Sequence, residues 1–266
     1  MTLPKEGSEF TEYIDQGLTV EYRDASHKYW LHELVGGVPK RTPAISVTSA
    51  LKVLDKPALM SWAEACGAEG AARLAELGEL DVVAADAIYK VREFGLGMDA
   101  KRDAGAERGT LVHRVLEIYN REARPPNVTD FELGVRGYVQ GLCSWLLDFA
   151  PEPVATEVLV GSRLHNFAGR VDLYCSTKSS ELELWDLKTS PRGIVYPEAH
   201  LQAAAYEGAG MECGFDPDRV FLLAVGEDGT YTVTHCHAEL DDFLTVLEAS
   251  RMMSRLRRAT ASKEPE

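Results

Sequence analysis

Residues 167–188 read FAGRVDLYCSTKSSELELWDLK and contain two short β-rich segments joined by a polar stretch. Apolar residues dominate both segments, and the polar residues around 178–180 predict a turn between two strands. Asp172 lies within the first segment, and Asp186 lies near the end of the second. In a two-stranded ribbon of this length the two carboxylates can lie side by side, so the ribbon predicts a place where two negative charges meet.

The chemistry of this ribbon follows from its carboxylates. Two carboxylates a few ångströms apart repel each other, so they need protons or cations between them. Oxygen ligands suit hard cations such as Mg²⁺ or Mn²⁺. Lys188 follows Asp186 by two residues, which places both side chains on one face of a strand. An ammonium beside such a cluster can orient a water nucleophile or stabilise charge on a transferring phosphoryl group.

The Asp-x-Lys pattern by itself is common by chance and is more often a surface ion pair. Its context favours a functional role, because Asp186 lies between Leu184 and Leu187, and burying an unpaired carboxylate among apolar residues costs free energy.

The rest of the chain predicts helices before the ribbon and mixed elements around and after it. This prediction depends on the spacing of apolar residues, on residues that can cap helices, and on Gly or Pro at the boundaries of segments. The predicted elements are a hairpin at 18–32, a short helix capped by Ser46 or Thr48, helices at 57–77, 81–94, 98–121 and 130–149, strands at 154–160, 167–175 and 181–188, a helix at 197–212, strands at 219–225 and 230–235, and a helix at 239–258.

This order predicts an α/β fold with a central mixed β-sheet flanked by helices. We expect an N-terminal hairpin and helical cap over residues 1–95, a core over 96–258 and a flexible polar tail over 259–266.

Composition narrows the possible functions. The chain has 266 residues, with 28 Lys and Arg against 42 Asp and Glu, so its formal net charge is −14. That balance argues against holding nucleic acid by bulk positive charge, but not against a metal-dependent enzyme acting on phosphates. There is no C-x-x-C pair among the five cysteines, so a structural zinc site or a disulfide scaffold is not expected. We also expect no membrane span and no secretory signal.

Three further motifs accompany the ribbon in a set order. Gly109-Thr110-Leu111-Val112-His113 lies in the predicted helix at 98–121, Glu157 lies in the first strand of the predicted core, and Gln202 and Tyr206 lie four residues apart in the helix after the ribbon.

Together with Gly169–Asp172 and Asp186–Lys188, these motifs resemble the PD-(D/E)XK nuclease superfamily, and specifically its RecB-like exonuclease branch. The resemblance covers about residues 105–210. Residues 43–48, with Leu59 and Trp62 downstream, are also similar to the N-terminal part of phage-encoded members. The resemblance implies a restriction-endonuclease-like core and a divalent-metal-dependent DNA exonuclease that leaves 5′-phosphates, in recombination, repair or phage DNA processing.

The resemblance also implies a role for each matched residue around one or two Mg²⁺ or Mn²⁺ ions. Asp172 would be the central ligand, Asp186 and the Leu187 carbonyl would complete that site, and His113 would add a nitrogen ligand. Glu157 would bind the second ion, and Lys188 would position the attacking water and help to deprotonate it.

A second set of residues would brace the site or contact DNA. Gln202 and Tyr206 share one helix face at i and i+4. Arg108, beside Gly109, is the strongest candidate for a phosphate contact, and Arg170 lies near the strands. The implied partners are DNA and a single-strand annealing or recombination protein. We expect a cytoplasmic location, in the host cytoplasm if the chain is phage-encoded.

Alternatives remain at this point. The same fold also serves structure-selective or site-specific endonucleases and non-catalytic nucleic-acid-binding modules. From the local sequence alone, His113 would be interpreted as a half-buried helix histidine and Glu157 as an acid that faces solvent. Iron–sulfur relatives carry three clustered cysteines near the C-terminus, whereas Cys213 and Cys236 here are far apart, so we expect no cluster.

Overall fold

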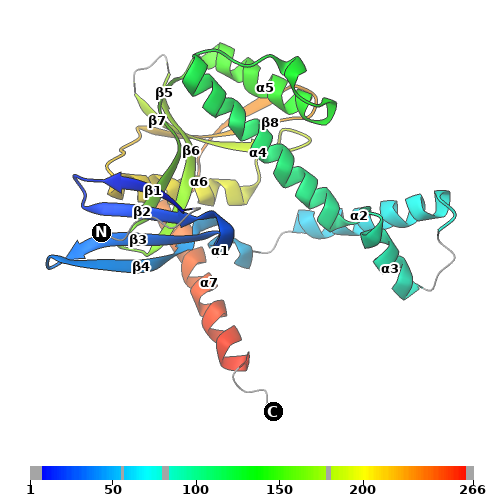
Figure 1. Cartoon of the computed structure of the whole chain (residues 1–266), viewed down its shortest axis with the longest axis horizontal. Helices are drawn as coiled ribbons and strands as arrows, with labels where there is room; N and C mark the ends of the chain where they lie inside the picture. The colour runs from blue at the N-terminus through cyan, green and yellow to red at the C-terminus, as the bar shows by residue number, and fades with distance from the viewer. Residues whose placement is uncertain (1–7, 55–56, 80–83, 178–180, 262–266) are drawn as a thin grey trace. The chain divides into compact units, whose positions relative to one another are not determined.

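The computed structural model describes residues 8–54, 57–79, 84–177 and 181–261. Within these residues the chain forms a nine-stranded mixed β-sheet with helices packed against it, as Figure 1 shows. The predicted α/β class with a central mixed sheet is therefore confirmed. Contacts divide the chain into two compact units, residues 1–53 with 112–266, and residues 54–111. The sheet belongs to the first unit.

The N-terminal part of the sheet is an antiparallel meander of β1 (Ser8–Tyr13), β2 (Leu18–Arg23), β3 (Lys28–Val35) and β4 (Val38–Ser46). The predicted hairpin at 18–32 is confirmed as β2 and β3. Val38 and Pro39 begin β4. Pro39 is tolerated there because β4 pairs with β6 at Ile45 and Ser46, at the far end of the strand.

A short helical segment follows β4. Ser46 caps α1 (Val47–Ala50), and its Oγ accepts a hydrogen bond from the Ser49 backbone N–H at 3.1 Å. Of the two predicted caps, the structure therefore selects Ser46 over Thr48. The single turn η2 (Leu51–Val53) completes the segment.

The remaining strands form the other half of the sheet. They are β5 (Glu152–Ser162), β6 (Phe167–Ser176), β7 (Leu182–Thr189), β8 (Arg219–Val225) and β9 (Tyr231–His235). The strand order is β1-β2-β3-β4-β6-β7-β8-β9, with β5 also paired to β6. The β4–β6 and β7–β8 pairs are parallel, and the other pairs are antiparallel, which makes the sheet mixed.

Helices α5 (Leu133–Phe149) and α6 (Pro197–Glu212) pack against this half of the sheet, and α7 (Leu240–Ala261) packs mainly against α6 and η2. The turn η3 (Val128–Asp130) precedes α5. Trp145 of α5 packs against Trp185 of β7, with their rings 4.8 Å apart. Phe243 of α7 meets Phe167 of β6 edge to face. Pro197 lies in the first turn of α6, where its missing N–H costs nothing.

The other unit carries α2 (Pro57–Glu76), α3 (Ala84–Glu93) and the first part of α4 (Met98–Glu122). The two compact units divide inside α4, and the N-terminal strands belong to the unit of the sheet. The physical reasons are the β4–β6 pairing and the buried side chains of Val112, Val115 and Leu116. Whether residues 57–94 cap the core stays a prediction.

Some predicted features fall at the edges of the described chain. Helix α7 continues to Ala261, three residues into the predicted tail, and residues 262–266 lie outside the described residues. The predicted turn at 178–180 and the predicted helix start at 81 also lie outside them. Among the described helices, none combines the length and apolarity that crossing a bilayer requires.

Candidate metal centre

The candidate centre lies at a fork in the sheet, by which we mean the gap along one edge of β6 between its pairing with β4 and its pairing with β7. Along one edge β6 pairs with β5, and along its other edge it pairs with β4 at Phe167–Ala168 and then with β7 at Leu173–Ser176. Residues 169–172 lie between these two pairings, and within the described chain no strand pairs with them along that edge. Asp172 is therefore the last residue before β7 joins.

Three acidic residues, Glu157 of β5, Asp172 of β6 and Asp186 of β7, lie side by side on neighbouring strands at this fork. The register of β5 with β6 places Glu157 across from Asp172. The register of β6 with β7 places Asp186 on the other side of Asp172, one residue beyond the last recorded pair. Directly opposed like charges destabilise a sheet. The arrangement therefore needs positive charge or protons to be stable.

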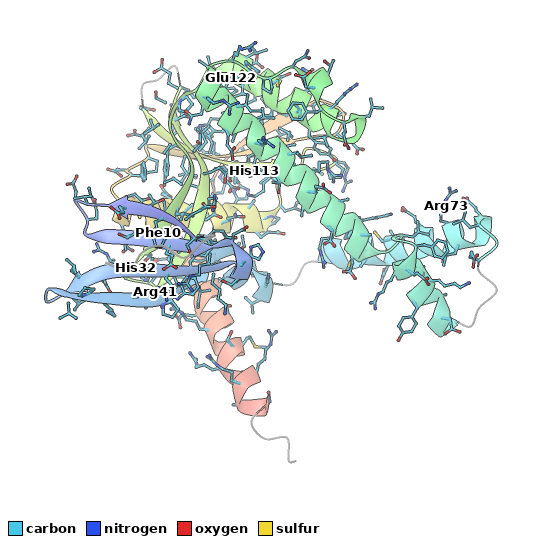
Figure 2. All side chains as sticks on the ribbon, in the orientation of Figure 1. Phe10, His32, Arg41, Arg73, His113 and Glu122 are labelled. Atoms are coloured by element: carbon cyan, nitrogen blue, oxygen red, sulfur yellow. The ribbon has the colours of Figure 1, made fainter. Side chains whose placement is uncertain are left out.

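His113 of α4 supplies positive charge to this row, and Figure 2 marks its position on the helix. Its Nδ1 lies 3.2 Å from Glu157 Oε1 and 3.3 Å from Asp172 Oδ1. Burial lowers the pKa of His113, but the Asp172 and Glu157 carboxylates outweigh it and raise the pKa to about 10. The imidazole of the metal-free protein is therefore a cation at neutral pH.

Asp172 is held by groups on three sides. Its Oδ2 accepts a hydrogen bond from the Leu187 backbone N–H at 2.6 Å, and its side chain is almost fully buried. Burial raises its pKa, but the charges of His113 and Lys188 and the Leu187 N–H hold the pKa below its ordinary value. Asp172 is therefore ionised, with an orientation set by the backbone of β7.

Asp186 is fully buried, at 0% exposure, and differs from Asp172 in its partners. Lys188 Nζ lies 2.5 Å from its Oδ2, whereas its Oδ1 has no hydrogen-bond partner among the described residues. Burial and the nearby Asp172 raise the pKa of Asp186 to about 6, against the opposing effect of Lys188. Buried carboxylate oxygens are normally satisfied, so this one indicates a missing proton or cation.

Lys188 lies on the same strand as Asp186. Burial lowers the pKa of Lys188, but Asp186 and Asp172 offset this and hold it above its ordinary value. Its Nζ also donates to the Leu187 carbonyl oxygen at 3.4 Å. The ammonium is thus charged, and the Leu187 backbone reaches the site through both its N–H and its carbonyl.

These residues fit a hard divalent cation. One ligand atom each from His113, Glu157 and Asp172 lie within 4.8 Å of one another. Carboxylate oxygens with one imidazole nitrogen are a ligand set that Mg²⁺ and especially Mn²⁺ accept. The buried Oδ1 of Asp186 is an unmatched acceptor beside this set. We call His113, Glu157, Asp172, Asp186 and Lys188 the metal-centre cluster.

Tyr206 and Gln202 of α6 adjoin the cluster. Gln202 Nε2 donates to Tyr206 Oη at 2.7 Å. A Cβ at Gly169 would lie 2.3 Å from the Tyr206 ring, so the ring rests directly on the backbone of β6 and residue 169 has to be glycine. Burial, then Asp186 and Asp172, raise the pKa of Tyr206 well above its ordinary value. The hydroxyl therefore stays protonated beside the carboxylates.

The two arginines that were predicted to contact DNA or brace the site have different surroundings. Arg170 Nη2 forms a 2.6 Å ion pair with Glu9 of β1, and its Nη1 lies 4.0 Å from Glu157. Its guanidinium also lies over the Tyr22 ring, 5.1 Å from the ring centre. The structure thus ties Arg170 to two carboxylates. Arg108 lies on the part of α4 that belongs to the unit of residues 54–111.

The backbone at Glu157 is strained. Its φ is +51°, in the left-handed region, although it lies in a strand and is not glycine. Residues held in this way cost about 1–3 kcal/mol and cluster at functional sites. The residue with this backbone conformation is also the one whose carboxylate contacts His113, and no pattern in the sequence signals the positive φ.

Sequence reasoning also missed Glu9 and Tyr22, which reach Arg170 from β1 and β2. Their contact depends on the pairing of the N-terminal meander with the rest of the sheet, and no local signal marks it. The five cluster residues, in contrast, are brought together as expected. Their catalytic and ligand roles stay predictions.

Comparisons with known proteins add little. No family model and no curated protein matches the chain. One solved structure, described as "Crystal structure of SSO0001", is 20% identical with a TM-score of 0.31 and covers 42% of this chain and 56% of that chain. The match thus spans little more than half of that protein, and at this TM-score it carries no argument. The functional case depends on the geometry of the cluster.

Proposed function

We propose that the chain is a divalent-metal-dependent deoxyribonuclease of the PD-(D/E)XK superfamily, of the RecB-like exonuclease branch. In this proposal the sheet and its helices form a restriction-endonuclease-like core. The reaction is hydrolysis of phosphodiester bonds that leaves 5′-phosphates. One observation carries the proposal, namely the convergence of the metal-centre cluster at the fork between β4 and β7.

The cluster residues would hold one or two Mg²⁺ or Mn²⁺ ions. Asp172 would contribute to both positions, because it lies between Glu157 and Asp186. His113 and Glu157 would hold one side, and Asp186 with the Leu187 carbonyl the other. When bound, such an ion polarises a phosphoryl oxygen and lowers the pKa of water.

Lys188 has a separate task in this proposal. Its ammonium lies beside Asp186 at the edge of the cluster, where it can hold a water by a hydrogen bond in line with the phosphorus. It also places a positive charge near the negative charge that grows on the phosphoryl oxygens. The Tyr206 ring packs against Gly169 of β6, and Gln202 would brace the site by its hydrogen bond to the Tyr206 hydroxyl.

The acidic balance of the chain limits how DNA would bind. With a net charge of −14, the exterior repels the phosphate backbone, so affinity depends on cations within the cluster. We therefore expect DNA binding to require a divalent ion. A single-strand annealing or recombination protein is the kind of partner that would deliver DNA ends, in recombination, repair or phage DNA processing.

The test compares end-labelled linear DNA with covalently closed circular DNA, each with Mg²⁺, Mn²⁺ or chelator. We expect metal-dependent release of 5′-phosphorylated products from linear DNA and none from the circle. Cleavage of the circle would instead indicate an endonuclease of the same fold.

Variants of the cluster complete the test. Asp172→Asn and Lys188→Ala are expected to lower kcat by about 10³-fold or more, because each removes charge stabilisation of the transition state. Asp228→Asn, in the β8–β9 turn, is the control and should keep full activity. Undiminished activity in both cluster variants, or metal-independent cleavage, would contradict the proposal.

A further inference from the structure

A cavity of about 110 Å³ opens beside the metal-centre cluster, between the end of β7 and the start of α6. Lys188 and Ser190 line it from the strand side, Ile194 and Tyr196 from the connecting loop, and Glu198 and Gln202 from the helix. The mechanism proposed above gives roles to Lys188 and Gln202, but it assigns no role to the loop residues Ile194 and Tyr196.

The cavity shares two walls with the candidate centre. Lys188, which lies 2.5 Å from Asp186, forms one of them. Gln202, which donates to Tyr206, forms another. An occupant of the cavity would therefore lie next to the lysine that pairs with Asp186, beside the place where the proposed function puts the scissile phosphate.

The loop that forms the cavity is held in place by hydrogen bonds. The Ser190 N–H donates to the Val225 carbonyl at 3.1 Å, the Gly193 N–H donates to the Ser190 carbonyl at 2.9 Å, and the Ile194 N–H donates to Ser190 Oγ at 3.2 Å. Gly193 has a φ of +61°, which lets the loop turn back toward α6. The cavity is therefore largely formed before any ligand binds.

The chemistry of the walls selects the kind of occupant. Tyr196 and Ile194 are 40% and 39% exposed, so an aromatic ring and an aliphatic side chain remain uncovered at the cavity. The Glu198 carboxylate and the Lys188 ammonium both line the cavity, so its walls carry one charge of each sign. A neutral, flat group with apolar faces fits these walls, and a nucleobase is such a group.

We propose that this cavity is the subsite for the nucleotide next to the scissile phosphate, and that the base of this nucleotide contacts the Tyr196 ring. The inference depends on the proposed nuclease function and names where its substrate lies. Every base has a π-face, so such a subsite accepts all four bases and discriminates against a missing one. Tyr196 would then be a substrate-binding residue that takes no part in the chemical step.

The test uses short DNA substrates with an abasic residue on one or the other side of the first scissile phosphate. For the wild-type protein we expect one of the two placements to raise KM about 10- to 100-fold relative to intact DNA. Tyr196→Ala should raise KM on intact DNA by a similar factor and erase the difference between intact and abasic substrates. Tyr196→Phe, which keeps the ring, should behave as the wild type.

Two controls separate the possible failures. Phe10→Ala removes an aromatic ring of similar exposure on β1, 39% exposed, and should leave KM unchanged. Thermal stabilisation by Mn²⁺ should be unchanged in Tyr196→Ala, since the metal-centre cluster is intact. If the wild-type protein cleaves intact and abasic DNA with equal KM, the subsite proposal is overturned while the nuclease function stands. If it cleaves neither substrate with any divalent ion, both proposals are overturned.

Discussion

Two buried carboxylate clusters in the same sheet have opposite electrostatic balances. In the N-terminal meander, Glu21 is surrounded by Arg23, His32 and Arg41, which we call the Glu21 cluster. In the metal-centre cluster, Asp186 is equally buried but has one cation beside it and an oxygen without a hydrogen-bond partner among the described residues. Figure 2 labels His32 and Arg41 in the first cluster and His113 in the second.

The Glu21 cluster is complete as it stands. Glu21 is 2% exposed, and both its oxygens accept hydrogen bonds, from Arg23 Nε at 2.7 Å, Arg41 Nε at 3.0 Å and His32 at 2.7 Å. Burial raises the pKa of Glu21, but these bonds outweigh it and lower the pKa below its ordinary value. The two arginines also lie over the Trp30 ring, 4.5 and 4.3 Å from its centre.

The difference shows how a structural ion cluster can be distinguished from a candidate ligand site. Both place a buried acid near a histidine and basic side chains. In one the acid accepts several hydrogen bonds and its pKa falls, whereas in the other a carboxylate oxygen has no hydrogen-bond partner among the described residues and the pKa of the acid rises to about 6. A protein keeps such an unfavourable carboxylate where a ligand completes it.

The largest expected effect that sharpens this comparison is thermal stabilisation by Mn²⁺. At pH 8, an ion concentration of 100 times Kd adds about 2.7 kcal/mol to the free energy of unfolding. The increase in Tm should vanish in Asp172→Asn and remain in Glu21→Gln, as measured by differential scanning calorimetry. An equal increase in Asp172→Asn would show that the ion binds elsewhere.

The same stabilisation should depend on pH. The folded-state pKa of Asp186, about 6, is above its ordinary value of 3.8, so in the metal-free protein its contribution to stability is complete below pH 3.8 and lost as pH rises through about 6. An ion replaces that proton and also the proton of His113, whose pKa is about 10. The Tm increase should therefore be larger at pH 8 than at pH 5. An equal increase at both values would contradict this account.

A smaller effect is expected when each buried acid is neutralised in the absence of metal. Glu21→Gln should lower the free energy of unfolding at pH 7 by about 2 kcal/mol, because it leaves a half-buried cluster of cations without its anion. Asp186→Asn should cost less, because it removes an acid that lacks one partner. Urea denaturation with chelator present measures both. A larger loss in Asp186→Asn would identify Asp186 as a structural acid.

The contribution of Glu21 should also have the opposite pH dependence to that of Asp186. Because the folded-state pKa of Glu21 lies below its ordinary value, its stabilisation is present above pH 4.5 and lost as pH falls through the folded-state value. The gap in stability between wild type and Glu21→Gln should therefore shrink in acid.

The smallest expected effect concerns the backbone of Glu157. Glu157→Gly and Glu157→Gln both remove the carboxylate, but only glycine adopts a φ of +51° without strain. The glycine variant should be more stable than the glutamine variant by about 0.5–1 kcal/mol, and both should lose the Mn²⁺ effect. Ala150, at φ +45° at the end of α5, provides the matched control, since Ala150→Gly should gain a similar amount without affecting metal binding.

Patterns of short range decided much of this structure from the sequence alone. Apolar spacing predicted the helix at 98–121, and the strand pattern placed Asp172, Asp186 and Lys188 on one ribbon, whereas His113 and Glu157 stood out only through the family resemblance of the motifs. Such features are readable because a helix face or a strand face depends on residues two to four positions apart. The α/β class follows from the order of these elements.

Tertiary structure decided the features that depend on residues distant in the chain. Arg170, a predicted DNA contact, pairs with Glu9 across 161 residues. The β4–β6 pairing joins the N-terminal meander to the rest of the sheet, whereas the Glu21 cluster forms within that meander. The strain at Glu157 and the cavity at Tyr196 likewise arise where separate elements meet. Burial and charge at these places are properties of the folded neighbourhood, and no local spacing of residues encodes them.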